Sequence, residues 1–327
     1  MRVTVLSGGV GGARFTRGLL AMLRERLPDG EGGTTAQVTV VANTGDDMWL
    51  HGVRVCPDLD TLMYTLGGAV HEQQGWGRRG ESTHVADDLV AYGLGWEWFT
   101  LGDLDLATHL ARTALLRSGL PLSAVTQRLA ARWSPGVRLL PMSDDEVETH
   151  VVTDEGTLHF EEWWVRHRAA VPARGFVQVG VQDATPAPGV LEALAGADVV
   201  VVPPSNPVVS VGTILGVPGV RDALRATSAP VVGVSPVIGG APVRGMADAC
   251  LTATGVATDA AAVARHLGLR ATGGVLDAWL VDDVDSGAVA PLRAEGWVAA
   301  AAPTLMTDVA ATARMAAAAL DLVGVAP

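Results

Sequence analysis

Lysine is absent from the 327 residues, so all 23 basic side chains are arginine. The chain therefore has no amine for Schiff-base or pyridoxal chemistry and no Walker-type phosphate lysine. Two cysteines, Cys56 and Cys250, are too few for a disulfide framework, and neither lies in a metal-binding Cys-x-x-Cys spacing. Aromatic residues make up only 5% of the chain.

Long apolar runs are also missing, since no stretch approaches the roughly 20 residues that a membrane helix needs. The amino terminus shows no apolar leader with a cleavage site. We therefore expect a soluble, cytoplasmic protein with no membrane partner. The formal charge of −12 argues against nucleic acid as a partner, although an arginine-lined pocket could bind a phosphate locally.

What is present is a hydrophobic content of 49% and a length ample for a large core. Residues 3–6 form a short apolar run that ends in a glycine-rich turn, residues 13–27 have helical spacing, and residues 37–42 are a second apolar run. This β-α-β pattern predicts a parallel sheet. Continuous apolar runs at 199–202 and 231–234 predict strands buried on both faces. We predict an α/β fold with a Rossmann-like, doubly wound, mostly parallel sheet.

Residues 68–135 break this pattern, because strand signals vanish and tryptophans gather there. We predict helices at 106–116 and 123–133, with Ser123 as the N-cap of the second. The pair also fits a helix-turn-helix motif, but the acidic chain argues against that reading.

We interpret this segment as a helical insertion that contributes to the acceptor site. Residues 1–67 and 136–327 would then form one α/β nucleotide-binding core. Strands at 137–140, 148–153 and 157–160 would make a small mixed-sheet region within it. Further elements are a strand at 275–281 and a terminal helix at 308–322.

The glycine turn is the first candidate site. Gly8, Gly9, Gly11 and Gly12 follow a strand and precede a helix, whose free N–H groups would bind an anion without lysine. The turn is not a dinucleotide fingerprint, because Arg14 stands where the third glycine should be, and it is not a P-loop. Arg14 would add a charged contact to a phosphate. The alternative is a tight β-α turn without a ligand.

Two acidic loops, 43–47 and 57–61, follow the second predicted strand. Carboxylates beside a phosphate site repel the ligand unless a cation lies between them, and Mg²⁺ prefers one or two carboxylates with phosphate oxygens and water. The alternative is that these aspartates cap helices and turns.

Four further residues carry polar groups that suit a binding site. Asp103 and His109 belong to an acidic motif that begins the first predicted insertion helix, where capping and structural roles are the alternatives. Ser205 and Asn206 follow a buried strand and offer a hydroxyl and an amide to a nucleotide. A proline-stiffened turn is the alternative for that loop.

These motifs together resemble the 2-phospho-L-lactate transferase family of coenzyme F-420 biosynthesis. They occur in order along nearly the whole chain, and residues 51–61 and 162–166 look like its actinobacterial phosphoenolpyruvate transferase branch. The motifs are Gly8–Arg14, Asn43–Asp47, Pro57–Thr61, Ala107–His109, Leu140–Asp145, Pro204–Pro207 and Leu305–Asp308.

The resemblance implies a reaction. The family transfers a phosphoenolpyruvyl or phospholactyl unit from a guanosine-diphosphate-activated donor to the ribityl hydroxyl of the deazaflavin Fo. GMP leaves, a phosphodiester forms, and Mg²⁺ is the cofactor. The resemblance also implies a homodimer.

Carried over by motif, Asp46 and Asp60 would be the catalytic, metal-proximal carboxylates, and Asp60 would orient the acceptor hydroxyl or take its proton. Substrate-binding residues would be Gly9, Gly11, Gly12 and Arg14 for the phosphates, Ser205 and Asn206 for the nucleotide, and Asp103 and His109 near the acceptor.

Leu104 departs from the family pattern, which usually has arginine there. Arg78, Arg79 or Arg112 would have to substitute, or the chain would be a nucleotide-binding regulatory member without turnover. An NAD-type oxidoreductase is a further alternative, weakened by the broken fingerprint. The sequence does not decide which three-carbon acid the donor carries.

Trp76, Trp96 and Trp98 are large residues that could stack on a deazaflavin. We favour the alternative, in which they belong to the core.

Overall fold

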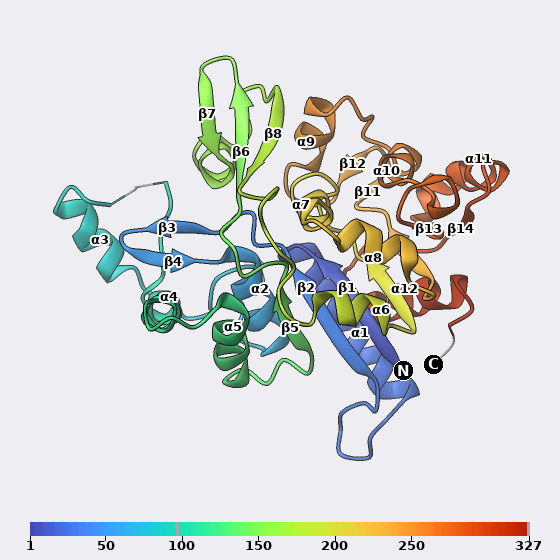
Figure 1. The fold of residues 1–327 in the computed structure, drawn as a ribbon, viewed down its shortest axis with the longest axis horizontal. Coiled ribbons are helices and arrows are strands. Elements are labelled where there is room, and N and C mark those ends of the chain that lie inside the picture. Colours follow the sequence, from blue (N-terminus) through green and yellow to red (C-terminus); the bar gives the residue numbers. More distant parts are fainter. Residues whose placement is uncertain (96–97, 326–327) are drawn as a thin grey trace.

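The structure, a computed structural model, describes residues 1–95 and 98–325 and has a seven-stranded sheet at its centre (Figure 1). The strand order is β14-β13-β10-β9-β1-β2-β5, and every neighbouring pair is parallel. This confirms the predicted doubly wound α/β fold. The strands are β1 (Arg2–Ser7), β2 (Gln37–Ala42), β5 (Arg138–Pro141), β9 (Val199–Val202), β10 (Val231–Val234), β13 (Ala278–Val281) and β14 (Val298–Ala301).

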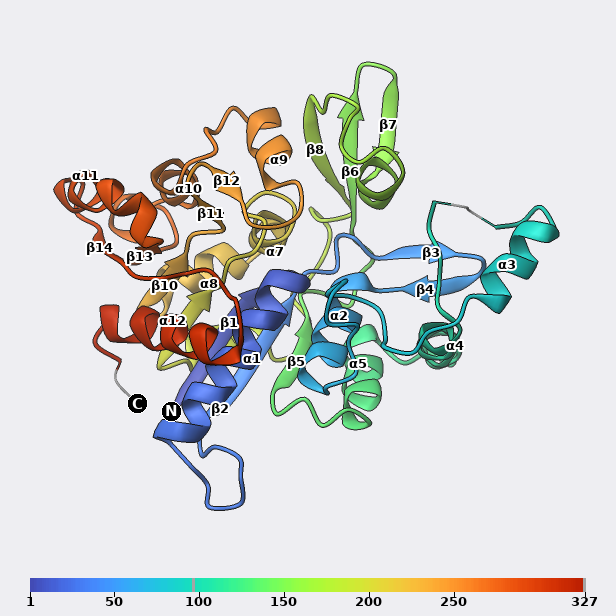
Figure 2. The ribbon, with the colours of Figure 1, turned by 180° about the vertical axis from the view of Figure 1, so that it is seen from behind.

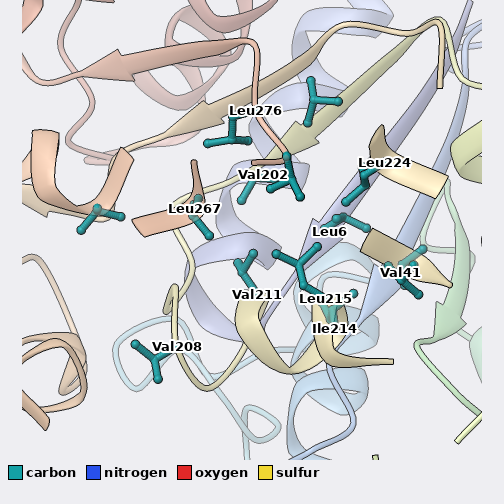
Figure 3. Close-up of a cluster of buried hydrophobic side chains, with 14 of the residues drawn as sticks. Leu6, Val41, Val202, Val208, Val211, Ile214, Leu215, Leu224, Leu267 and Leu276 are labelled. Carbon is teal, nitrogen blue, oxygen red and sulfur yellow. The ribbon is translucent and has the colours of Figure 1, made fainter. Parts of the chain in front are cut away.

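Helices cover both faces of this sheet because its strands are apolar on both sides. In β9, Val199 and Val201 belong to one buried cluster, and Val200 and Val202 belong to the other. Figure 3 shows Val202 in its cluster beside side chains of α7. The first cluster includes α1 (Val10–Arg26), α2 (Pro57–Leu66) and α12 (Val309–Leu322), and the second includes α6 (Val190–Ala195), α7 (Val211–Gly216), α8 (Val220–Ala226), α9 (Ala247–Ala253), α10 (Ala260–Leu267) and α11 (Val289–Ala294).

The region predicted as an insertion lies to one side of the sheet (Figures 1 and 2). It holds α3 (His84–Ala91), α4 (Asp103–Arg117) and α5 (Leu122–Ala131), beside a hairpin of β3 (Met48–Leu50) and β4 (Val53–Val55) that the sequence did not indicate. The predicted N-cap at Ser123 is wrong. Pro121 holds that position, and both the Ser123 N–H and hydroxyl donate to the Asp144 carboxylate, at 2.5 and 2.9 Å.

A small three-stranded sheet projects from the body of the molecule in both views (Figures 1 and 2). Its order is β7-β6-β8, and both pairings are antiparallel. The predicted mixed sheet is therefore wrong, because the strand expected at 137–140 is β5, which pairs with β2 in the central sheet. The strands are β6 (Glu148–Thr153), β7 (Gly156–His159) and β8 (Gly175–Val179). A π-helical turn, η1 (Glu162–Arg166), follows β7, and a short hairpin of β11 (Val237–Ile238) and β12 (Ala241–Pro242) follows β10.

Within the described ranges, the helices are all too short or too polar to cross a bilayer. Two 3₁₀ turns, η2 (Arg270–Thr272) and η3 (Asp283–Ala288), complete the secondary structure of the carboxyl-terminal half.

Replacing Leu6 tests the core between β1 and α7. Leu6 is fully buried, so Leu6→Ala removes packed methyl groups and leaves a cavity. We expect the free energy of unfolding to fall by about 3 kcal/mol in urea titrations. Leu110→Ala is the control, because Leu110 is 54% exposed on α4. An equal loss in both variants would contradict this packing.

Candidate active site

The sheet has a switch point between β1 and β9. The chain runs from β1 outward to β2 and β5, and then returns to place β9 on the other side of β1. Ligands of doubly wound folds bind where neighbouring strands diverge in this way, at the carboxyl ends of the strands. Here that point lies between the glycine turn after β1 and the loop of residues 203–210 after β9.

A cavity of about 310 Å³ lies at this switch point. Six predicted site residues line it: Gly9, Gly11, Arg14, Asp46, Ser205 and Asn206. Further lining residues from other segments are Asp58, Trp76, Phe160, Trp164, Arg244 and Met306. The structure therefore brings the first acidic loop and the glycine turn to one hollow, as the sequence predicted.

The glycines of the turn are required by close approach. A Cβ at position 11 would lie 2.0 Å from the carbonyl oxygen of Pro204, and one at position 9 would lie 2.4 Å from Oδ1 of Asp58. Gly12 does not line the cavity, because it packs against the Ser7 and Ser205 side chains. A larger residue at 11 would push the start of α1 away from the loop after β9, and one at 9 would displace the Asp58 carboxylate of α2.

Two aspartates at the cavity wall accept hydrogen bonds from the same asparagine side chain. The Asn43 amide donates to Oδ2 of Asp46 and Oδ2 of Asp58, each at 3.0 Å. Asp46 is buried, and its Oδ1 has no hydrogen-bond partner among the described residues. Glu161 is buried in the same neighbourhood. This cluster of carboxyl groups lacks an arginine or histidine ion pair within the described ranges.

Burial of these carboxylates raises their pKa values. Desolvation raises the pKa of Asp58 to about 6. Desolvation, with the charge of Asp58 added, raises the pKa of Glu161 to about 8. The pKa of Asp46 lies well above its ordinary value, through desolvation and then the charges of Asp58 and Glu161. A bound cation would reverse this effect, since it favours the ionised carboxylates.

Asp60 faces a different environment from Asp46. Its Oδ1 accepts from the Arg112 guanidinium, and its Oδ2 lies 3.6 Å from Nδ1 of His109. His109 is buried and lies 3.5 Å from Asp105, whose carboxylate accepts from the Tyr64 hydroxyl. The structure thus places Asp60 and His109 together in a buried network outside the cavity lining. Their predicted catalytic, metal and acceptor roles stay predictions.

Asp60, Asp105 and His109 do offer ligand atoms within 4.8 Å of one another, the spacing of a metal site. Arg112 already supplies a fully buried positive charge to Asp60. A second cation there would be repelled by the guanidinium. The cluster of Asp46 and Asp58 is the better candidate, because it borders the cavity and lacks such a counter-charge.

Asp103 is the first residue of α4 and lies outside the cavity lining, where its carboxylate faces the start of α3. Its carboxylate accepts from the Ser82 hydroxyl and from the backbone N–H groups of His84 and Val85. These hydrogen bonds lower the pKa of Asp103. The contacts are those of a helix cap, and its predicted acceptor role stays a prediction.

The loop after β9 is held by its own polar groups. The Ser205 hydroxyl accepts from the Gly8 N–H at 3.2 Å. The side-chain Oδ1 of Asn206 accepts from the N–H groups of Val208 and Val209. Both residues border the cavity, so they shape it whether or not they contact a nucleotide.

Sequence reasoning missed Asp58 and Arg244 as cavity residues, and it missed Glu161 as a buried neighbour of Asp46. Asp58 stands in the same motif as Asp60, and only the rotation of α2 decides which of them faces the cavity. Glu161 and Arg244 carried no motif signal, because they come from the turn between β7 and η1 and from the loop after β12. Trp98 packs edge-on against Phe99 and does not line the cavity, whereas Trp96 lies outside the described residues.

Residues 3–316 match the family described as 2-phospho-L-lactate transferase CofD. The chain belongs to the CofD family. This confirms the family resemblance that the sequence motifs indicated, and the protein is a member of a transferase family.

Relatives of this CofD-family chain share more than half of its residues. It is 58% identical over 326 residues to a phosphoenolpyruvate transferase of Streptomyces griseus, with 98% of each chain covered. It is 56% identical to one of Thermobifida fusca, with the same coverage, and 54% identical to one of a Mycobacterium species, with 99% of each covered. A solved UPF0052-family structure from Bacillus halodurans shares the fold, with TM-score 0.63 and 18% identity over 98% of each chain.

Removing Arg112 tests the buried network. Arg112→Met leaves the Asp60 carboxylate buried without a counter-charge, so we expect the free energy of unfolding to fall by about 3–5 kcal/mol in urea. Adding Asp60→Asn should recover most of that loss, because the orphaned charge is gone. Arg128→Met on the exposed face of α5 is the control. A double variant as unstable as Arg112→Met would contradict the pairing.

Buried Glu161 should make the metal-free protein less stable as pH rises. The pKa of Glu161 is about 8 in the folded chain, against an ordinary 4.5. Its stabilising contribution is therefore present below about pH 4.5 and lost as pH rises through about 8. We expect the melting temperature in chelator to fall between about pH 5 and 9, and Glu161→Gln to flatten that slope.

Glu155→Gln is the control for that slope, since Glu155 is exposed at the β6–β7 turn. It should leave the pH profile unchanged. A Glu161→Gln profile as steep as that of the unaltered protein would show that Glu161 does not hold a proton in the fold.

Proposed function

We propose that the protein transfers a phosphoenolpyruvyl unit from a guanosine-diphosphate-activated donor to the ribityl hydroxyl of Fo, releasing GMP. The observation that carries the proposal is the juxtaposition of opposite chemistries in one cavity. The glycine turn, Arg14 and Arg244 suit a diphosphate, and they lie beside the carboxylates of Asp46 and Asp58. Family membership supplies the reaction class.

The carboxylate cluster fits Mg²⁺. Asp46 Oδ1 is buried and has no hydrogen-bond partner in the part of the chain that the structure describes, and Asp46 and Asp58 share the one Asn43 amide. Oxygen donors from one or two carboxylates, completed by phosphate oxygens and water, are what Mg²⁺ prefers. Asp46 and Asp58 would hold the ion. When bound, it would neutralise charge on the diphosphate and on the leaving GMP.

The residues of the chain position the two substrates. Backbone N–H groups at the start of α1, with Arg14, would bind the diphosphate of the donor. The acceptor hydroxyl oxygen forms a bond to the phosphorus that carries the three-carbon acid. The bond from that phosphorus to the bridging oxygen breaks, and the oxygen leaves with GMP. The hydroxyl proton passes to a cavity carboxylate.

The enolpyruvyl group is favoured over the lactyl group by the relatives. Those of Streptomyces griseus, Thermobifida fusca and the Mycobacterium species are named phosphoenolpyruvate transferases, and each aligns over nearly the whole chain. Comparing kcat/KM for the enolpyruvyl and lactyl donors tests this choice directly.

The full reaction is tested by incubating the protein with Fo, the activated donor and Mg²⁺ and following GMP by chromatography. We expect Asp46→Asn and Asp58→Asn to lower kcat/KM by roughly 100-fold and to raise the Mg²⁺ concentration needed for half-maximal rate. Asp60→Asn should leave that Mg²⁺ requirement unchanged, because Asp60 faces Arg112.

Asp88→Asn on the exposed surface of α3 is the matched control and should keep full activity. GDP binding without GMP release in the unaltered protein would overturn the transferase proposal and favour a nucleotide-binding regulator. A Mg²⁺ requirement that shifts in Asp60→Asn but not in Asp58→Asn would move the metal to the buried network.

A further inference from the structure

One wall of the cavity is aromatic. Trp76, Phe160 and Trp164 line it together. The rings of Phe160 and Trp164 are stacked, with centroids 6.0 Å apart and planes at 29°. The Trp76 and Trp164 centroids lie 6.2 Å apart. Trp76 is 42% exposed although its indole lines a cavity, so a large apolar face is open to a ligand.

The backbone of η1 is what directs Trp164 to this wall. Trp163 is buried in the small sheet, and its indole N–H donates to the Val171 carbonyl at 2.7 Å. The π-helical turn carries the next residue, Trp164, to the cavity instead. Arg168 and Ala169 follow with φ of 50° and 54°, a conformation that costs energy for residues other than glycine. π-helical turns are rare and occur frequently at functional sites.

Arg244 completes the wall with a positive charge. Its guanidinium carbon lies 5.7 Å from the Trp76 ring centroid, and its Nη2 donates to the Gln73 carbonyl at 2.8 Å. Its charge also acts on Arg14, at the start of α1, so the two cations lie near each other. A ligand with a flat ring and a phosphate would satisfy both the aromatic faces and these cations.

We propose that Trp76, Trp164 and Arg244 form a stacking site for a planar heteroaromatic ring. The inference rests on the proposed function, in which both substrates carry such a ring: guanine in the donor and deazaflavin in the acceptor. Stacking on tryptophan fixes the plane of the ring, and the cavity limits its position along that plane. These side chains are then specificity determinants for one of the two substrates.

Calorimetric titration with three separate probes tests the site: GDP, Fo, and inorganic pyrophosphate, which has no ring. We expect Trp76→Ala and Trp164→Ala each to weaken one ring-bearing probe by roughly 10- to 100-fold. Pyrophosphate binding should not change. Trp164→Phe should recover most of the affinity, because it keeps an aromatic face.

Trp49→Ala is the matched control. Trp49 is 41% exposed on β3, outside the cavity lining, and its indole N–H donates to Glu146. Loss of Fo binding alone assigns the wall to the acceptor, and loss of GDP binding alone assigns it to guanine. Unchanged binding of both, or equal weakening of pyrophosphate, would overturn the stacking site.

Binding and turnover separate this inference from the function on which it rests. If the unaltered protein releases no GMP but the alanine variants lose ring binding, the transferase proposal fails and the stacking site stands. If GMP is released normally and the variants bind both rings as tightly as before, the stacking site fails and the transferase stands.

Discussion

The close packing of backbone at the carboxyl ends of β1 and β9 is the constraint on which the cavity depends. Position 11 has no room for a Cβ because the Pro204 carbonyl occupies that space, and position 9 is closed by Asp58. Three segments far apart in the sequence therefore meet within contact distance.

The distribution of arginine around this point explains which acidic groups remain electronegative. Asp60 is paired with Arg112, and Asp47 lies 3.9 Å from the buried Arg54 guanidinium. Asp46 and Asp58 have only an amide between them. Buried carboxylates without a counter-charge lower the free energy of unfolding. The protein nevertheless keeps two of them at the edge of its cavity, where perturbed groups are typical of functional sites. Protonation lowers this cost in the metal-free protein, as the raised pKa values of Asp46, Asp58 and Glu161 indicate, and a divalent cation with a diphosphate would balance the ionised carboxylates.

The fold was predictable from the sequence because its signals are local and repeated. Apolar runs fixed β2 and β9 to the residue, and the glycine turn located the switch point. The choice between Asp58 and Asp60 was not predictable. Residues two apart on a helix point roughly 200° apart, so only one can face the cavity. Which one does so depends on the packing of α2 against its neighbours, and Trp164 likewise reaches the wall only through a π-helical turn that has no sequence signature.

Leu104, which stands where the family usually has arginine, lies in the helical region and not in the cavity lining. Leu104 is 40% exposed, and its carbonyl accepts from Nη1 of Arg78 at 2.8 Å. Arg78 in turn lies over the rings of Tyr64 and Trp133, so an arginine does occupy this region from another element. Neither Leu104 nor Arg78 lines the cavity. Leucine at this position therefore removes no cation from the site where we place the diphosphate, and it gives no structural reason to regard the chain as a member without turnover.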